Sequence, residues 1–214
     1  MKKINFIVIA ILLSMAQVQA SSGYEKAMRQ TIDDMYAASS PEQYLAVANK
    51  FDRIGGAEMD QWLPSYYSAF CYIMLATNTK DGLKMDGYLD KADEYLAVSD
   101  KRNGDRVEIL AMRGFTAMMR ITVDPATRGQ EYSMKSVGFL QQAMQLDNQN
   151  PRVIMMLAQM QFGTAQFFGS DTKEACTMFT NALALFEAEE KESAGINPSW
   201  GKSQVESMLS KCEG

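Results

Sequence analysis

The chain has 214 residues, a net charge of −5, three cysteines and no histidine. Its acidic balance argues against nucleic acid as a partner, because an acidic surface repels phosphate. The lack of histidine excludes the usual zinc sites and the Ser–His and Cys–His nucleophile pairs. We therefore predict a protein that is not an enzyme, with no catalytic residues, no metal site and no cofactor.

The first twenty residues have the pattern of a secretory signal peptide. Lys2 and Lys3 precede the apolar run "INFIVIAILL", and "AQVQA" supplies small residues at the cleavage-site spacing. An N-terminal membrane anchor is the alternative, but this run is short for a bilayer that needs ~20 apolar residues. Cleavage after Ala20 leaves residues 21–214 as one domain with a net charge of −7 and no stable membrane insertion. We expect it in the periplasm of a Gram-negative bacterium, with secretion as the alternative.

The hydrophobic pattern of the remaining chain is helical throughout. Apolar residues recur at three- and four-residue steps, and strand-like runs with a period of two are absent. Polar breaks between the apolar segments are short, except for longer connections expected around "TVDPATRGQEY" and "KDGLKMDGY". The predicted helices span residues 24–38, 42–56, 59–77, 84–99, 105–122, 130–146, 151–168, 172–191 and 200–212.

Several predicted helices begin at residues that suit a helix N-terminus. Ser40, Asp105 and Asn150 can each accept hydrogen bonds from the free N–H groups of a first turn. Pro41 and Pro151 follow two of these caps, at positions where proline costs no hydrogen bond. Short connections between well-capped helices predict antiparallel helical hairpins.

Small and aromatic residues repeat at matching places in successive hairpins. The pair Leu157-Ala158 lies in one helix, and its partner carries Ala175, Phe179 and Ala182 at spacings of four and three. Small residues let two helices approach closely, and Phe179 fills the space between them. The earlier hairpins carry Leu110, Gly114, Ser136, Leu140 and Ala143; then Ala69, Tyr72, Ala92, Leu96 and Ser99; and finally Phe51 and Ile54.

This pattern resembles the tetratricopeptide repeat, a unit of two helices with small and aromatic residues at their contact. The resemblance implies an all-α fold in which antiparallel hairpins stack as a TPR-like α-solenoid. A non-repetitive helical bundle is the alternative. The match is best over residues 151–185, then 107–150, 62–106 and 24–61. The implied hairpins span about 24–56, 59–99, 105–146 and 151–191, with a cap helix at 200–212.

The cap helix, residues 200–212, carries a narrow apolar stripe that includes Val205 and Cys212. Such a helix can cover the last hairpin of a solenoid. If it folds back on its predecessor, Cys212 and Cys176 can form a disulfide, which export would permit. The sequence leaves this pairing open. Cys71, inside an aromatic segment, is expected to be a buried free thiol.

The repeat resemblance also implies a concave face lined by the first helix of each hairpin. Some members of the family clamp a carboxylate there with Lys and Asn, but this chain has residues such as Met112 and Met155 at the corresponding places. A surface of aromatic, Met and Arg side chains suits a protein or peptide partner in the cell envelope. Alternatively, the groove is partly closed and these are core residues. The expected groove residues are Tyr66, Phe70, Glu108, Phe115, Met119, Arg152, Gln159 and Phe162.

Three other functions compete with a binding or scaffold module. A pocket in the concave face would make the protein a small-ligand receptor or an enzyme. The 17 methionines raise the idea of a copper(I) carrier with thioether ligands, although methionine also fills gaps in cores. Asp81, Asp86 and Asp90 do not have the spacing of a calcium-binding EF-hand loop. We therefore predict a binding module, with the receptor, the enzyme and the copper carrier as alternatives.

Overall fold

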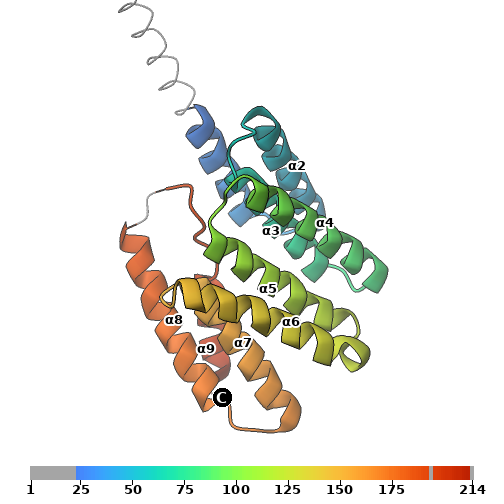
Figure 1. Ribbon diagram of the computed structural model, residues 1–214, viewed down its shortest axis with the longest axis vertical. Coiled ribbons are helices and arrows are strands. Elements are labelled where there is room, and N and C mark those ends of the chain that lie inside the picture. The colour runs from blue at the N-terminus through green and yellow to red at the C-terminus, as the bar shows by residue number, and fades with distance from the viewer. Residues whose placement is uncertain (1–22, 193–194, 213–214) are drawn as a thin grey trace, which may run out of the picture.

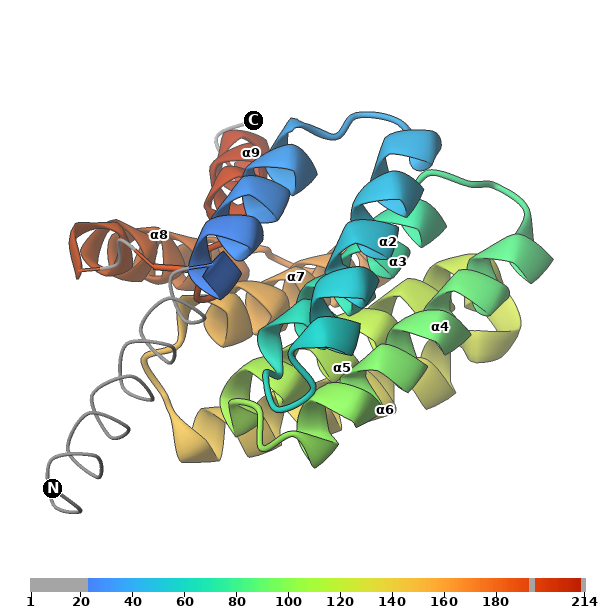
Figure 2. The ribbon, with the colours of Figure 1, turned by 90° about the horizontal axis from the view of Figure 1, so that it is seen from above.

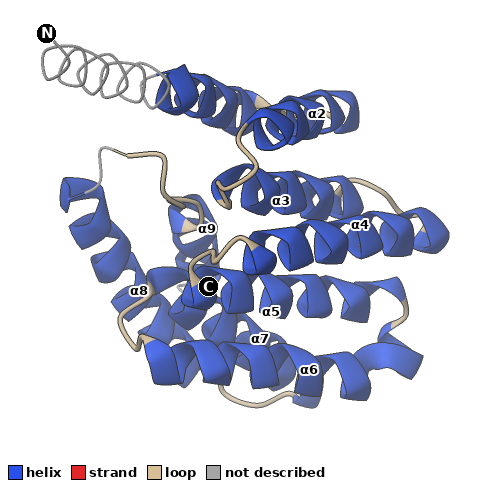
Figure 3. Ribbon diagram, turned by 45° about the horizontal axis from the view of Figure 1, so that its top comes forward, coloured by secondary structure: helices blue, strands red, loops and turns tan. Residues whose placement is uncertain are grey.

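The computed structural model describes residues 23–192 and 195–212 of the chain. The predicted signal peptide, residues 1–20, lies outside this part. Figure 3 shows helices joined by loops, and the described residues contain no strand, as the predicted all-α class requires. A helix over residues 23–37 comes first. It is followed by α2 (Pro41–Ala57), α3 (Leu63–Thr77), α4 (Gly82–Lys101), α5 (Arg106–Val123), α6 (Pro125–Leu146), α7 (Pro151–Phe168), α8 (Lys173–Glu192) and α9 (Lys202–Cys212).

The helices pack in chain order, because short turns reverse the chain after each one (Figure 1). Each helix from α2 to α8 contacts the next, and α3, α5 and α7 also contact one another in sequence. These three helices therefore form an inner layer, with α4, α6 and α8 outside it. The final helix, α9, packs against α8. Figure 2 shows α9 and the helix of residues 23–37 at the same end of the molecule.

The helix starts follow the predicted capping chemistry. The Ser40 side chain accepts from the backbone N–H of Gln43, and the Gln43 side chain completes a capping box. Asp105 and Asn150 each accept two backbone N–H groups from the first turns of α5 and α7. Each cap satisfies donors that a helix leaves free, which contributes about 1 kcal/mol to stability. The predicted caps at these three helices are confirmed.

The sixth and fourth helices begin earlier than the hydrophobic pattern indicates. Helix α6 begins at Pro125, so most of the expected long connection before residue 130 is helical. Its cap is Asp124, which accepts from the backbone N–H three residues on at 3.3 Å. Asp81 caps α4 at Gly82 in the same way. The prediction was wrong for α6 because its first turn has no large apolar residue, although the Asp-Pro signal was present.

Close helix contacts occur where small residues were expected. A Cβ atom on Gly114 would lie 2.7 Å from Leu140 Cδ2, so only glycine allows α5 and α6 to approach this closely. Phe179 is fully buried, and its ring centroid lies 6.2 Å from that of Phe162. These contacts join α5 to α6 and α7 to α8, and they support the stacked-hairpin architecture.

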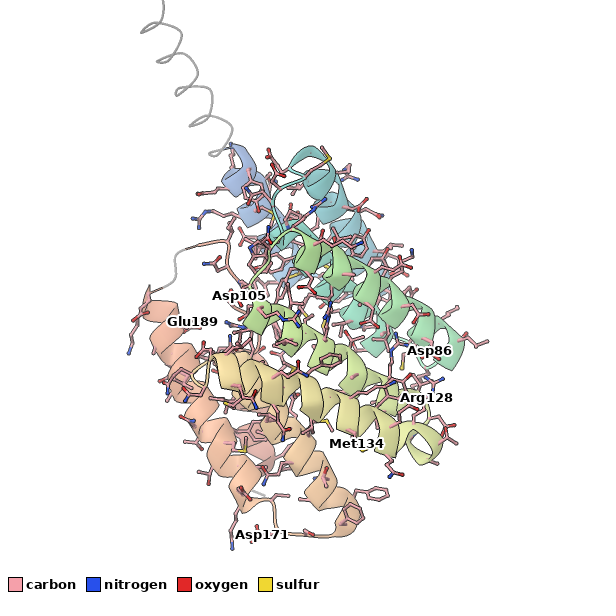
Figure 4. All side chains as sticks on the ribbon, viewed as in Figure 1. Asp86, Asp105, Arg128, Met134, Asp171 and Glu189 are labelled. Atoms are coloured by element: carbon pink, nitrogen blue, oxygen red, sulfur yellow. A yellow bond between two sulfur atoms is a disulfide. The ribbon has the colours of Figure 1, made fainter. Side chains whose placement is uncertain are left out.

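Ion pairs link the outer helices along one face. Arg128 of α6 binds Asp86 of α4 with both guanidinium nitrogens, at 2.7 and 2.8 Å (Figure 4). Arg120 of α5 binds Asp90 at 2.7 Å and Asp93 at 2.8 Å. Of the aspartates that were considered for calcium, Asp86 and Asp90 therefore pair with arginines, and Asp81 caps α4. In the described ranges, no group of three or more His, Cys, Asp or Glu side chains could hold a metal ion.

Candidate functional site

The interior of the helical stack is entered by the chain's own C-terminal segment, residues 195–201. Trp200 of this segment is 2% exposed. Its ring packs between Phe70 and Phe115, with centroid distances of 5.3 and 5.8 Å. Its indole Nε1 donates to Tyr66 Oη at 2.8 Å. The concave surface expected to receive a partner is therefore covered in its middle by Trp200.

A buried ionic network lies directly behind Trp200. Tyr66 donates to Glu108 at 2.8 Å, and Asn150 donates to the other oxygen of Glu108 at 2.7 Å. Arg152 Nε also binds Glu108, at 2.8 and 3.0 Å, and its two terminal nitrogens bind Glu189 at 2.8 and 2.6 Å. Figure 4 shows Glu189 on the end of α8 that lies near the start of α5. Each charge in this network has its partner, so the network fixes elements α3, α5, α7 and α8 together.

The environment fixes the protonation states of this network. Burial and the nearby carboxylate of Glu108 raise the pKa of Tyr66 well above its ordinary value, so its hydroxyl stays protonated and donates. Burial acts to lower the pKa of Arg152, but the carboxylates of Glu108 and Glu189 outweigh it and raise that pKa. Arg152 therefore remains charged over the physiological pH range, and its ion pairs act as a structural element.

An open cavity lies beside this network, at the end of the molecule shared by α9 and the helix of residues 23–37. Its volume is about 520 Å³, and an adjoining cavity of about 360 Å³ shares Tyr36, Glu190 and Ser199 with it. Volumes of this size fall in the usual range for small-ligand sites, ~300–1,000 Å³. The first cavity is lined by Met35, Tyr36, Tyr44, Phe70, Met74, Glu190, Ser199, Trp200, Gly201, Lys202, Ser203, Gln204 and Glu206.

The cavity has an apolar interior and a polar rim. Met35, Phe70 and Trp200 are buried lining residues, whereas Tyr36 is half-exposed and its hydroxyl lies 3.1 Å from Ser199 Oγ. Burial is the main cause that raises the pKa of Tyr36 and of Tyr44, so both phenols are neutral near pH 7. This arrangement offers aromatic faces to an apolar ligand and hydrogen bonds at its edge.

The C-terminal wall of the cavity is fixed at both ends. Gly201 has φ +118°, and a Cβ atom there would lie 2.6 Å from Phe186 Cζ, so this tight turn requires glycine. At the other end of α9, Cys212 forms a disulfide with Cys176 of α8, the pairing that the sequence left open. Cys71 is a buried free thiol whose pKa is raised by burial. The turn and the disulfide hold α9 against the cavity.

The residues expected to line the groove do not form one surface in the structure. Phe70 lines the cavity, and Phe115 contacts Trp200. Three others, Tyr66, Glu108 and Arg152, form the buried network; Phe162 contacts Phe179, and Met119 and Gln159 are half-buried.

Sequence reasoning missed the cavity residues of the first helix and of the C-terminal segment. The first hairpin matched the repeat pattern weakly, so Met35 and Tyr36 were not assigned to a face. The predicted cap helix began at Trp200, but the insertion of this side chain into the interior depends on contacts with distant residues such as Tyr66, 134 positions away. The sequence did carry one signal for Tyr36 and Trp200, because each is an aromatic residue beside a polar break. Tyr36 precedes the break "AASSPEQ", and Trp200 follows the break "GINPS".

The methionines considered as copper ligands lie mainly in the core. Met112 and Met156 are fully buried, and Met155 is 2% exposed. They belong to the continuous apolar core, where an unbranched side chain fills irregular gaps. In the described ranges, no helix is long and apolar enough to cross a membrane.

Comparison with known proteins adds one informative match. No protein-family model and no curated protein matches the chain. Among solved structures, the fold is similar to that of the HusA haemophore from Porphyromonas gingivalis, with a TM-score of 0.78 and 26% sequence identity. The alignment covers 88% of this chain and 92% of that chain. The match supports an all-helical protein with a binding role, and it favours the small-ligand alternative over the TPR-like scaffold.

Proposed function

We propose that this protein is an exported carrier that captures a flat, largely apolar small molecule of the porphyrin class, haem included. The ligand would lie in the cavity between the helix of residues 23–37, α3 and α9. The observation that carries the proposal is the similarity to a haemophore over almost the whole of both chains. The predicted signal peptide, residues 1–20, supports export to the periplasm or out of the cell.

The chemistry of the cavity supports this ligand class. Tyr36 and Tyr44 offer aromatic faces, and the buried side chains of Met35, Phe70 and Trp200 form the apolar wall behind them. A flat conjugated ring gains stacking and dispersion contacts on such walls, about 0.5–1.5 kcal/mol for each aromatic contact beyond the area it buries. The ligand need not displace the buried network, because the cavity lies beside it.

Haem iron would find few suitable ligands here. Proteins hold haem iron through His, Cys, Met or Tyr, and this chain has no His. The lining offers Tyr36, Tyr44, Met35 and Met74. The raised pKa values of both tyrosines disfavour the phenolate that iron prefers, and Met35 is 1% exposed. The ring would therefore supply most of the binding free energy, and an iron-free porphyrin would bind comparably.

A peptide-binding scaffold has less support. Its expected groove is occupied by Trp200, and its inward charges are paired within the chain. A partner protein in the cell envelope remains part of the proposal only as the receptor that would accept the ligand from this carrier.

Titration with haemin and with protoporphyrin IX tests the proposal. We expect saturable 1:1 binding of both, seen as a shift of the Soret absorbance band. The two dissociation constants should agree within about tenfold, or ~1.4 kcal/mol. Binding of neither ligand would overturn the proposed function, and binding of haemin alone would overturn the argument that the ring dominates.

A further inference from the structure

One charged pair stands at the rim of the cavity. Lys202 is the first residue of α9, and its Nζ lies 2.7 Å from Glu190 Oε2 at the end of α8. Both side chains line the cavity. Among the described residues that line either cavity, Lys202 is the only cation. A carboxylate is therefore already bound to the one cationic group that a ligand would meet.

The two partners differ in how firmly they are held. The Lys202 side chain is 27% exposed and follows Gly201, whose turn is packed against Phe186. The Glu190 side chain is 59% exposed. An ion pair at this exposure stabilises the fold very little, so a competing carboxylate can replace Glu190 easily. Lysine would stay at the wall, and glutamate would move into solvent.

Of the other carboxylates around Lys202, Glu206 and Glu187 act on it through their charge alone, and Glu190 is the one that is hydrogen-bonded to it. Glu189, the remaining carboxylate of the adjoining cavity, is bound to both terminal nitrogens of Arg152. Lys202 stays protonated because its hydrogen bond to Glu190 raises its pKa. The first turn of α9 lines the cavity with it, so the positive end of the helix dipole adds to the same attraction.

We propose that Lys202 is the specificity-determining residue of the cavity: it binds a carboxylate of the ligand in exchange for Glu190, and so selects flat apolar molecules that carry an acidic side chain. This inference rests on the proposed function, since it assigns one end of the same ligand. It makes Glu190 a built-in competitor that occupies the lysine when no ligand is present.

The experiment compares an acid with its neutral ester. Protoporphyrin IX and its dimethyl ester share one ring, and both would be titrated in the same low fraction of dimethyl sulfoxide. The proteins are the wild type, Lys202→Met and Glu190→Gln. We expect Lys202→Met to weaken binding of the acid about fivefold, the size of one partly exposed ion pair. Glu190→Gln should tighten binding of the acid about threefold, because the competitor is removed. Neither variant should change binding of the ester.

Binding of the ester reports on recognition of the porphyrin ring without recognition of its carboxylate, and it shows that each variant is folded. If both ligands bind but the ratio of their affinities is the same in all three proteins, Lys202 does not read the carboxylate and this inference is overturned. If neither ligand binds the wild type, the proposed function fails and this inference fails with it. A second readout is salt: the acid should lose more affinity than the ester as ionic strength rises, and this difference should vanish in Lys202→Met.

Discussion

The two sides of the segment 195–201 are built differently. On one side, Trp200 meets a buried network in which Arg152 is 3% exposed and bound to two carboxylates. On the other side, the same Trp200 forms part of an open cavity, whose rim pair of Lys202 and Glu190 is partly solvated. Both sides contain aromatic and charged residues, so residue type alone does not separate structure from site.

The difference lies in how completely the polar groups are paired and covered. A buried charge is tolerated only when its hydrogen bonds are satisfied, so the network of Glu108 and Arg152 resists change. A half-exposed pair costs little to break, so the rim can exchange partners. Substitutions on the first side should therefore change stability, and substitutions on the second should change binding.

The largest effect is expected for Arg152→Met. It removes the cation that neutralises Glu108 and Glu189, and an unpaired buried carboxylate costs about 3–5 kcal/mol of unfolding free energy. Chemical denaturation followed by circular dichroism measures this loss. The matched control is Lys91→Met, which breaks an exposed pair with Glu94 and should leave the midpoint almost unchanged. A similar midpoint for the two variants would show that the network is not structural.

Removing the disulfide should have the next largest effect. Cys176→Ser with Cys212→Ser opens a cross-link between residues 36 positions apart, which stabilises by about 3–4 kcal/mol in the chain-entropy model. Porphyrin binding should also weaken, because α9 forms a wall of the cavity.

Thiol titration is the control for the disulfide variant. The folded wild-type protein should show no reactive thiol, because Cys71 is buried and its pKa is raised by burial. The unfolded, unreduced protein should show one. Two additional thiols in the unfolded wild type would mean that the disulfide does not form.

Trp200→Phe should affect both sides of the segment to a moderate extent. It removes the hydrogen bond from indole Nε1 to Tyr66 Oη, which still donates to Glu108, so the loss is that of one hydrogen bond, about 1 kcal/mol. It also replaces an indole ring in the cavity wall with a smaller ring. Thermal unfolding and porphyrin titration should therefore both change, in contrast to Arg152→Met. A change in only one of the two measurements would mean that Trp200 belongs to one side alone.

The smallest effect on stability is expected for Tyr36→Phe. This change removes a half-exposed hydroxyl that lies 3.1 Å from Ser199 Oγ, worth at most about 1 kcal/mol. The aromatic face remains, so porphyrin affinity should change less than threefold. A large loss of stability would show that the rim is a structural contact.

Helix order and most helix starts could be predicted from the sequence because they depend on local chemistry. Ser40, Asp105 and Asn150 cap the helices that follow them, as their side chains and positions indicate. The start of α6 at Pro125 was missed since its first turn has no large apolar residue to reveal the helical period.

The site was less predictable because it depends on contacts between distant segments. The repeat resemblance implied that Glu108 and Arg152 face inward, but it could not show whether another segment covers them. The covering residue, Trp200, lies 134 positions from Tyr66, which it contacts. The repeat resemblance also implied a binding surface at the centre of the concave face, whereas the cavity lies between the helix of residues 23–37 and α9.

The most direct test of the ligand site compares two pairs of aromatic residues. Tyr36→Ala with Tyr44→Ala removes two cavity walls. Phe167→Ala with Phe168→Ala is the matched control, because these rings are 81% and 73% exposed at the turn between α7 and α8, at the opposite end of the molecule from the helix of residues 23–37 in Figure 1. We expect the first variant to weaken protoporphyrin IX binding at least about tenfold, or ~1.4 kcal/mol, and the second to leave it unchanged. Unchanged binding in the first variant with a loss in the second would contradict the assignment of the cavity as the ligand site.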